Sequence, residues 1–220
     1  MNENQYTIST AMKYGLAFIF VNSVGMLLLT LLCFGPIFKL SADYFIVYIL
    51  IFCMIQIIGM IFCLPCPEAV VPQRGLLIGW SVLLLGVFIL GILWLMFLLK
   101  GGIMSPALAY LWMIPWLFGC LAAGFWLWTL FLLKLTQGIH AQKCEWLAGT
   151  ILILHSLAML PIALWIYHEG IVPNFMPTPY MLPSVLLSMI NLTIHSLLTA
   201  CLWRVISQQN TLFIDNQPSP

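Results

Sequence analysis

One apolar stretch of the chain, residues 182–206, carries a regular series of polar side chains. These are Ser184, Ser188, Asn191, His195 and Thr199. At about 100° per residue in a helix, all of them fall within an arc of roughly 80°, which is one helix face. Lipid offers no hydrogen bonds, so such a face must contact other helices or a wet cavity. The stripe therefore predicts either hydrogen bonds that join packed helices, which we favour, or the lining of a solute pathway.

Two histidines in neighbouring apolar stretches, His155 and His195, are candidate ligands for a b-type haem. Counted from the helix ends expected in the cytoplasm, they lie about 13 Å and about 16 Å deep, nearly at one level. One imidazole from each of two helices is what bis-imidazole ligation requires. The competing interpretation is a neutral histidine that is hydrogen-bonded to Ser156, Asn191 or a backbone carbonyl freed by Pro161. We favour that structural interpretation, because the sequence shows no second pair of histidines at matching depth.

Two amide side chains in the first two apolar stretches lie at a similar depth. Asn22 and Gln56 are each about 12 Å from the same side of the membrane. Together with His155 and His195 they predict one of two arrangements. The first is a polar layer at the centre of the helices, and the second is four unrelated packing contacts, which we favour because such contacts are common between membrane helices.

A second group of potential ligands lies in the polar connections. Cys63 and Cys66 form a C-x-x-C pair, and His140 and Cys144 lie four apart in another connection expected on the same side. Three thiolates and one imidazole would make a closed tetrahedral zinc site. The favoured alternative is a set of unreactive reduced thiols, and a third is dithiol exchange, whose usual strand-to-helix context is missing. The other cysteines, such as Cys201, are expected to be small buried hydrophobic residues.

Helices must position all these candidates, because the chain is too apolar for a water-soluble protein. Of its 220 residues, 63% are hydrophobic and 6% are charged, whereas soluble domains carry about 25% charged residues. The net charge of +1 excludes the basic surface that nucleic-acid binding needs. Six apolar runs are long enough to cross a hydrocarbon core of about 30 Å. They lie at residues 14–35, 44–64, 75–99, 110–135, 146–167 and 182–206.

The expected fold is all-α: a polytopic transmembrane six-helix bundle in a single domain, residues 1–220, with a short polar tail at 207–220. Lys and Arg at the ends of the spans are more frequent on one side, so both termini are expected in the cytoplasm. The residues on that side are Lys13, Arg74, Lys134, Lys143 and Arg204, and those on the other are Lys39 and Lys100. The expected location is a cell membrane, crossed several times.

Two short segments carry a resemblance to a known group of proteins. Residues 59–68, GMIFCLPCPE, are followed by Arg74-Gly75 and a new span, and residues 131–135 read FLLKL. Both are similar to patterns in uncharacterised bacterial six-span integral membrane proteins, over about a sixth of the chain. The resemblance implies a bacterial inner membrane location and brings no known activity.

The sequence favours a non-enzymatic role, although the question of an enzyme stays open. It contains no P-loop, H-E-x-x-H or G-x-S-x-G motif and no pair of carboxylates inside the spans. Two roles remain: an accessory or scaffold subunit, and a small-solute carrier that uses the polar face of the sixth span. The accessory role is favoured because an ion carrier would need charge inside the membrane. The rival class is a membrane redox protein that binds b-type haem.

The partners expected from this reading are the lipid bilayer and either another membrane protein or a second copy of the chain, not nucleic acid. Gly119 and Ala123 form a small-xxx-small pair that suits close helix contact, although the motif is common. No cofactor is expected apart from the haem and zinc alternatives.

Overall fold

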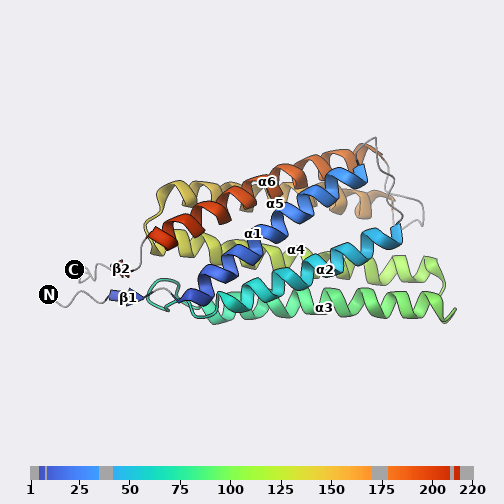
Figure 1. The fold of residues 1–220 in the computed structure, drawn as a ribbon. Helices are drawn as coiled ribbons and strands as arrows, with labels where there is room; N and C mark the ends of the chain where they lie inside the picture. The colour runs from blue at the N-terminus through green and yellow to red at the C-terminus, as the bar shows by residue number, and fades with distance from the viewer. Residues whose placement is uncertain (1–4, 8, 35–41, 170–177, 209–210, 214–220) are drawn as a thin grey trace.

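Six helices make up nearly all of the structure, a computed structural model that describes residues 5–7, 9–34, 42–169, 178–208 and 211–213 (Figure 1). The helices are α1 (Thr10–Phe34), α2 (Ala42–Phe62), α3 (Arg74–Lys100), α4 (Pro106–Gly138), α5 (Gln142–Glu169) and α6 (Thr178–Gln208). Each overlaps its predicted span, with ends that differ by a few residues. The prediction of an all-α bundle of six helices is confirmed.

Within the described residues, five helices are long and apolar enough to cross a membrane, as a multi-pass membrane protein requires. The apolar stretches are Thr10–Leu32, Arg74–Lys100, Pro115–Gly138, Gln142–Pro161 and Leu182–Gln208. In α2, the apolar stretch Ile46–Phe62 is shorter. Large apolar side chains such as Leu90 and Trp146 are exposed on the outer surface, which suits contact with lipid.

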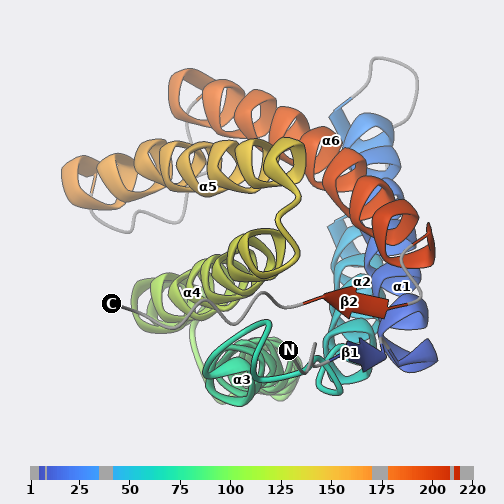
Figure 2. The same ribbon diagram turned by 90° about the vertical axis from the view of Figure 1, so that its left-hand side faces the viewer.

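The helices form three pairs around a common centre, α1 with α2, α3 with α4, and α5 with α6 (Figure 2). Contacts of α2 with α3 and of α4 with α5 join neighbouring pairs. A contact between α1 and α6 closes the ring. Because α1 and α6 are the first and last helices, this contact brings together side chains that are far apart in the sequence.

Two short strands hold the ends of the chain together. Strand β1 (Gln5–Thr7) pairs antiparallel with β2 (Thr211–Phe213), with Tyr6 opposite Leu212. Both strands lie at the end of the bundle where α1 begins and α6 ends (Figure 1). The segment 207–220, predicted as a polar tail, thus contains a strand in its described part, and residues 209–210 and 214–220 lie outside the described residues. Three residues are too few for an alternating pattern to predict a strand.

Two glycines allow the backbone to approach closely at this same end. A Cβ atom on Gly15 of α1 would lie 2.7 Å from the carbonyl oxygen of Gly59 of α2, so the two helices cross in near contact. A Cβ atom on Gly138, the last residue of α4, would overlap the carbonyl oxygen of Val70 in the α2–α3 connection. The polar connections are therefore packed against the helix ends.

Candidate functional site

A cavity of about 160 Å³ lies between α1, α4, α5 and α6. At about 30 Å³ per molecule it has room for about five waters, or for one small solute. Its walls are mainly apolar, and among the described residues no Asp, Glu, Lys or Arg lines it. The polar side chains that line it are Asn22, Ser23, Thr129, His155, Ser188, Asn191 and His195.

The polar stripe of α6 faces the interior of the bundle. Its middle members, Ser188, Asn191 and His195, line the cavity. Towards one end, the hydroxyl of Ser184 donates a hydrogen bond to a carbonyl oxygen of α5 at 2.9 Å. Towards the other, Thr199 is fully buried and donates to the carbonyl of His195 in its own helix, also at 2.9 Å. The stripe thus combines a contact that joins helices with the lining of a cavity.

His195 connects α6 to α1. Its Nδ1 lies 2.5 Å from Oγ of Ser23, a contact across the ring closure. The side chain is only 8% exposed, and Nε2 is buried without a hydrogen-bond partner in the part of the chain that the structure describes. One nitrogen therefore anchors the ring, while the other remains unpaired in a residue of the cavity wall.

His155 of α5 is held by the neighbouring helix α4. Its Nε2 donates to the carbonyl oxygen of Ala122 at 3.1 Å, and its ring lies against Phe125 with centroids 6.3 Å apart. The cavity beside it is about half the size of the smallest pockets that hold drug-sized ligands, roughly 300 Å³. The haem hypothesis for His155 and His195 stays a prediction.

The two amides of the first helices are hydrogen-bonded to each other. Nδ2 of Asn22 donates to Oε1 of Gln56 at 2.6 Å, and Gln56 is fully buried. Asn22 lines the same cavity as His155 and His195, and Gln56 lies behind it. The four residues thus belong to one polar layer, and the unrelated contacts that we favoured from the sequence are not what the structure shows.

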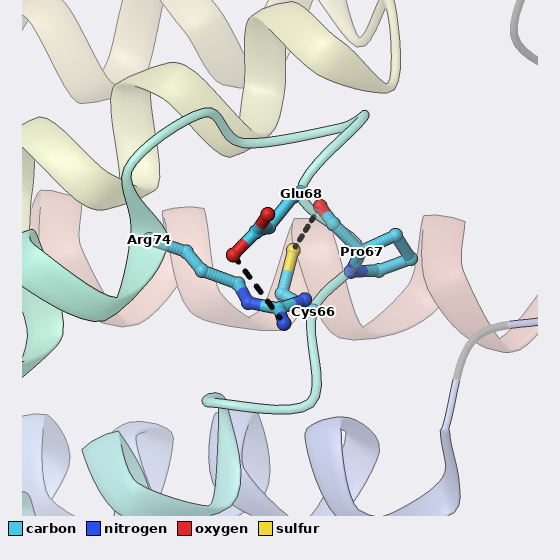
Figure 3. Close-up of polar contacts among 4 residues, drawn as sticks. All are labelled: Cys66, Pro67, Glu68 and Arg74. Carbon is cyan, nitrogen blue, oxygen red and sulfur yellow. Dashed lines mark hydrogen bonds and ion pairs between the residues drawn. The ribbon is translucent and has the colours of Figure 1, made fainter.

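The C-x-x-C pair, Cys63 and Cys66, lies in the α2–α3 connection. Figure 3 draws Cys66 with Pro67, Glu68 and Arg74. The thiol of Cys66 donates to the carbonyl oxygen of Pro67, with sulfur and oxygen 3.8 Å apart. Arg74 and Glu68 form an ion pair at 3.9 Å, which contributes little because Glu68 is 76% exposed. Burial raises the pKa of the Cys66 thiol to about 12, although Arg74 favours the thiolate. Cys66 is thus protonated and unreactive at neutral pH.

The four residues predicted as a zinc site, Cys63, Cys66, His140 and Cys144, do not converge. The sulfur of Cys144 lies 2.7 Å from that of Cys201 on α6, Cys63 faces α1, and His140 is exposed. Across the described ranges, no group of three or more His, Cys, Asp or Glu side chains could hold a metal ion. The zinc prediction is wrong because each thiol contacts the helix or loop beside it instead of the facing connection.

Two polar residues of the cavity, Ser23 and Thr129, were not predicted from the sequence. Both hydroxyls donate to a carbonyl four residues earlier in their own helix, Ser23 to Ile19 and Thr129 to Phe125. Isolated hydroxyl residues in apolar helices commonly do this, so neither stands out. The available signal was the position of Ser23 directly after Asn22, on the edge of the polar face.

The fold and the cavity fit a multi-pass helical membrane protein with a polar space among four of its helices. A scan against protein-family models, a search of curated proteins and a search of solved structures found no match to this chain. The resemblance to uncharacterised bacterial six-span proteins stays a prediction.

Proposed function

We propose that the protein is a carrier that binds a small uncharged polar solute in the cavity and moves it across the membrane. One observation carries this proposal: three residues that line the cavity keep a buried polar atom without a partner in the described residues. These atoms are Oδ1 of Asn22, Oδ1 of Asn191 and Nε2 of His195. An unpaired buried polar group costs about 1–3 kcal/mol, so a bound partner would stabilise this arrangement.

The same observation favours a carrier over an accessory subunit. Polar residues that only join helices pair with one another, as Asn22 does with Gln56 and His195 with Ser23. Those pairs fix the side chains of the cavity wall. Asn22 and His195 nevertheless each keep a second polar atom that has no partner among the described residues. The sequence favoured the accessory role because the spans carry no charge. That argument applies to ionic solutes, and it does not disfavour a carrier of a neutral solute.

Among the described residues no charged side chain lines the cavity, which favours an uncharged solute. A permanent ion without a counter-ion is costly at mid-membrane, by about 3 kcal/mol or more. A neutral molecule loses only its hydrogen bonds to water, which polar side chains that line the cavity, such as Ser188 and Asn191, can replace. The proposed solute is therefore neutral, polar and no larger than about five waters.

A bacterial inner membrane with both termini in the cytoplasm is part of the same proposal. Helices α1, α3 and α5 begin at the end of the bundle that holds β1 and β2 (Figure 1). Lys13, Arg74 and Lys143 lie in their first turns. Lys100 lies at the opposite end, and Lys39 is outside the described residues. This excess of positive charge favours the cytoplasmic side for the termini.

Solute entry into vesicles tests the proposed function. Proteoliposomes with the full-length protein are mixed with urea, acetamide or glycerol, and reswelling is followed by stopped-flow light scattering. We expect faster entry than into protein-free vesicles, and loss of that gain in the double variant Asn191→Leu with His195→Leu. Thr193→Leu, on the exposed side of α6, is the matched control and should behave as wild type. Entry of every solute at the protein-free rate would refute the carrier.

A further inference from the structure

The burial of the cavity wall changes from one end of the bundle to the other. We call the end that holds β1 and β2 the terminal end, and the opposite end the far side (Figure 1). On each helix the wall residues nearest to the terminal end are buried, namely Asn22, Ser23, Thr129, Ile151 and His195. The wall residues farther from it are only half-buried, namely Met26, Leu121, Phe125, His155, Met159, Ser188, Asn191 and Leu192. The cavity is thus most enclosed towards the terminal end.

A layer of fully buried apolar side chains lies between the cavity and the terminal end. Each of the four helices contributes one side chain, which follows its last wall residue by three positions, or about 4.5 Å along the helix. These residues, which we call the plug, are Ile19, Leu132, Ala148 and Leu198. They have no exposed surface and belong to one cluster of packed side chains. Because three positions are close to one helix turn, the plug continues the faces that form the wall.

The connection between α2 and α3 adds to the closure of the terminal end. Val70 and Val71 are buried in the same cluster as the plug. A Cβ atom on Gly138 would overlap the carbonyl oxygen of Val70, so the connection lies directly against the end of α4. Helices and a loop together close this end of the bundle.

No comparable layer is formed at the far side by the described residues of α1, α5 and α6. Beyond the cavity on that side, the buried residues of these helices are Leu29, Ala158 and Ser184. Ser184 donates a hydrogen bond to the carbonyl oxygen of Ala158, so these two form the contact between α5 and α6 and do not cross the cavity. In the described part of the chain, the cavity is closed to the terminal end and open to the far side.

We infer that the plug is the gate of the carrier, and that the structure shows this gate shut. The inference rests on the proposed function and adds how access to its cavity is controlled. A carrier opens its mid-membrane site to one side at a time, and an apolar constriction blocks a polar pathway because it excludes water. The solute therefore enters the cavity from the far side and reaches the terminal end only when the plug parts.

Thiol labelling of single cysteines tests which side reaches the cavity. The full-length protein with Ser188→Cys is placed in lipid vesicles and treated with a membrane-impermeant methanethiosulfonate. A protease-sensitive tag at the C-terminus identifies the molecules whose terminal end faces the reagent. We expect labelling to be at least about tenfold faster in molecules that expose the far side, with the unsubstituted protein as the background of native cysteines.

Two further cysteines mark the plug and the lipid. Ala148→Cys should react slowly from both sides, because this position is fully buried in the plug. Thr193→Cys is the control for labelling through lipid, because Thr193 is exposed on the outer side of α6. It should stay unlabelled from both sides.

A smaller side chain in the plug should open the terminal end. Adding Leu198→Ala to Ser188→Cys should raise labelling from the terminal end about tenfold or more, because the closed plug loses the packing of a large side chain. Leu197→Ala is the matched control, since Leu197 is 57% exposed beside it on the same helix. If Leu198→Ala does not fold, Leu198→Val replaces it and should give a smaller rise.

Equal labelling of Ser188→Cys from both sides would overturn the inference, as would labelling from the terminal end alone or from neither side. Equal effects of the Leu198 and Leu197 substitutions would also overturn it. Because labelling needs no solute, vesicle entry separates the two proposals. Solute entry with two-sided labelling refutes only the gate, whereas one-sided labelling without entry of any solute refutes the carrier.

Discussion

Filling the cavity from α6 should stop solute movement while the protein stays folded. Ser188 lines the cavity, whose volume is about 160 Å³. Its replacement by Phe adds five non-hydrogen atoms, a bulk that takes up most of the space. Replacement by Leu adds two and leaves a smaller open space. Overpacking costs about 1–3 kcal/mol of stability, which a bundle of this size should tolerate.

The assay is vesicle reswelling with the fastest-entering solute. We expect Ser188→Ala to match wild type, Ser188→Leu to be slower, and Ser188→Phe to fall to the protein-free rate. Thr193→Phe is the control, because Thr193 is exposed on the same helix and the added ring would enter lipid. Thermal unfolding in detergent verifies that each variant is folded.

Solute entry at the wild-type rate through folded Ser188→Phe would show that the cavity is not the pathway. If Ser188→Phe does not fold, Ser188→Leu decides the question. A folded Leu variant with an unchanged rate would refute the reasoning, since the larger side chain narrows the same cavity.

Three further predictions test the packing around the cavity. Mild oxidation should join Cys144 and Cys201 in a disulfide, because their sulfurs are 2.7 Å apart. After proteolysis between the two cysteines, a non-reducing gel should show the two fragments held together. Separate fragments would contradict the packing of α5 on α6. Gly138→Ala should destabilise the protein by about 2 kcal/mol or more, because the new methyl group overlaps the carbonyl of Val70; an unchanged unfolding temperature would count against that contact. Cys66 should react slowly with maleimide at pH 7 and faster as the pH approaches its pKa of about 12; with the unfolded protein as the control, rapid labelling at pH 7 would show that the thiol is not buried.

Element type was predictable from this sequence because the apolar runs are long and the bilayer limits the alternatives. Each of the six predicted spans overlaps one observed helix. Helix ends were less accurate. For example, α4 begins at Pro106 and not at 110, because proline suits the first position of a helix.

The candidate site was predictable only in part. Counting depth placed Asn22, Gln56, His155 and His195 at one level, and three of them line the same cavity. The sequence could not predict which helices are neighbours. The α1–α6 contact that brings Ser23 to His195 is a property of the closed ring, not of any local pattern.

The zinc hypothesis failed for the same reason. Residue spacing placed Cys63, Cys66, His140 and Cys144 in two connections on one side of the membrane. Helix packing then set the direction of each side chain, and Cys144 contacts Cys201 on α6 instead of Cys66. Spacing within a loop defines a metal site only when the loops face each other.

The central claim is that the space between α1, α4, α5 and α6 holds a small polar molecule. A high-resolution crystal structure of the protein grown in lipid and soaked in urea tests it most directly. We predict density in the cavity within hydrogen-bond distance of polar side chains that line it, such as Ser188 and Asn191. An empty cavity, or side chains that close the space, would contradict the claim.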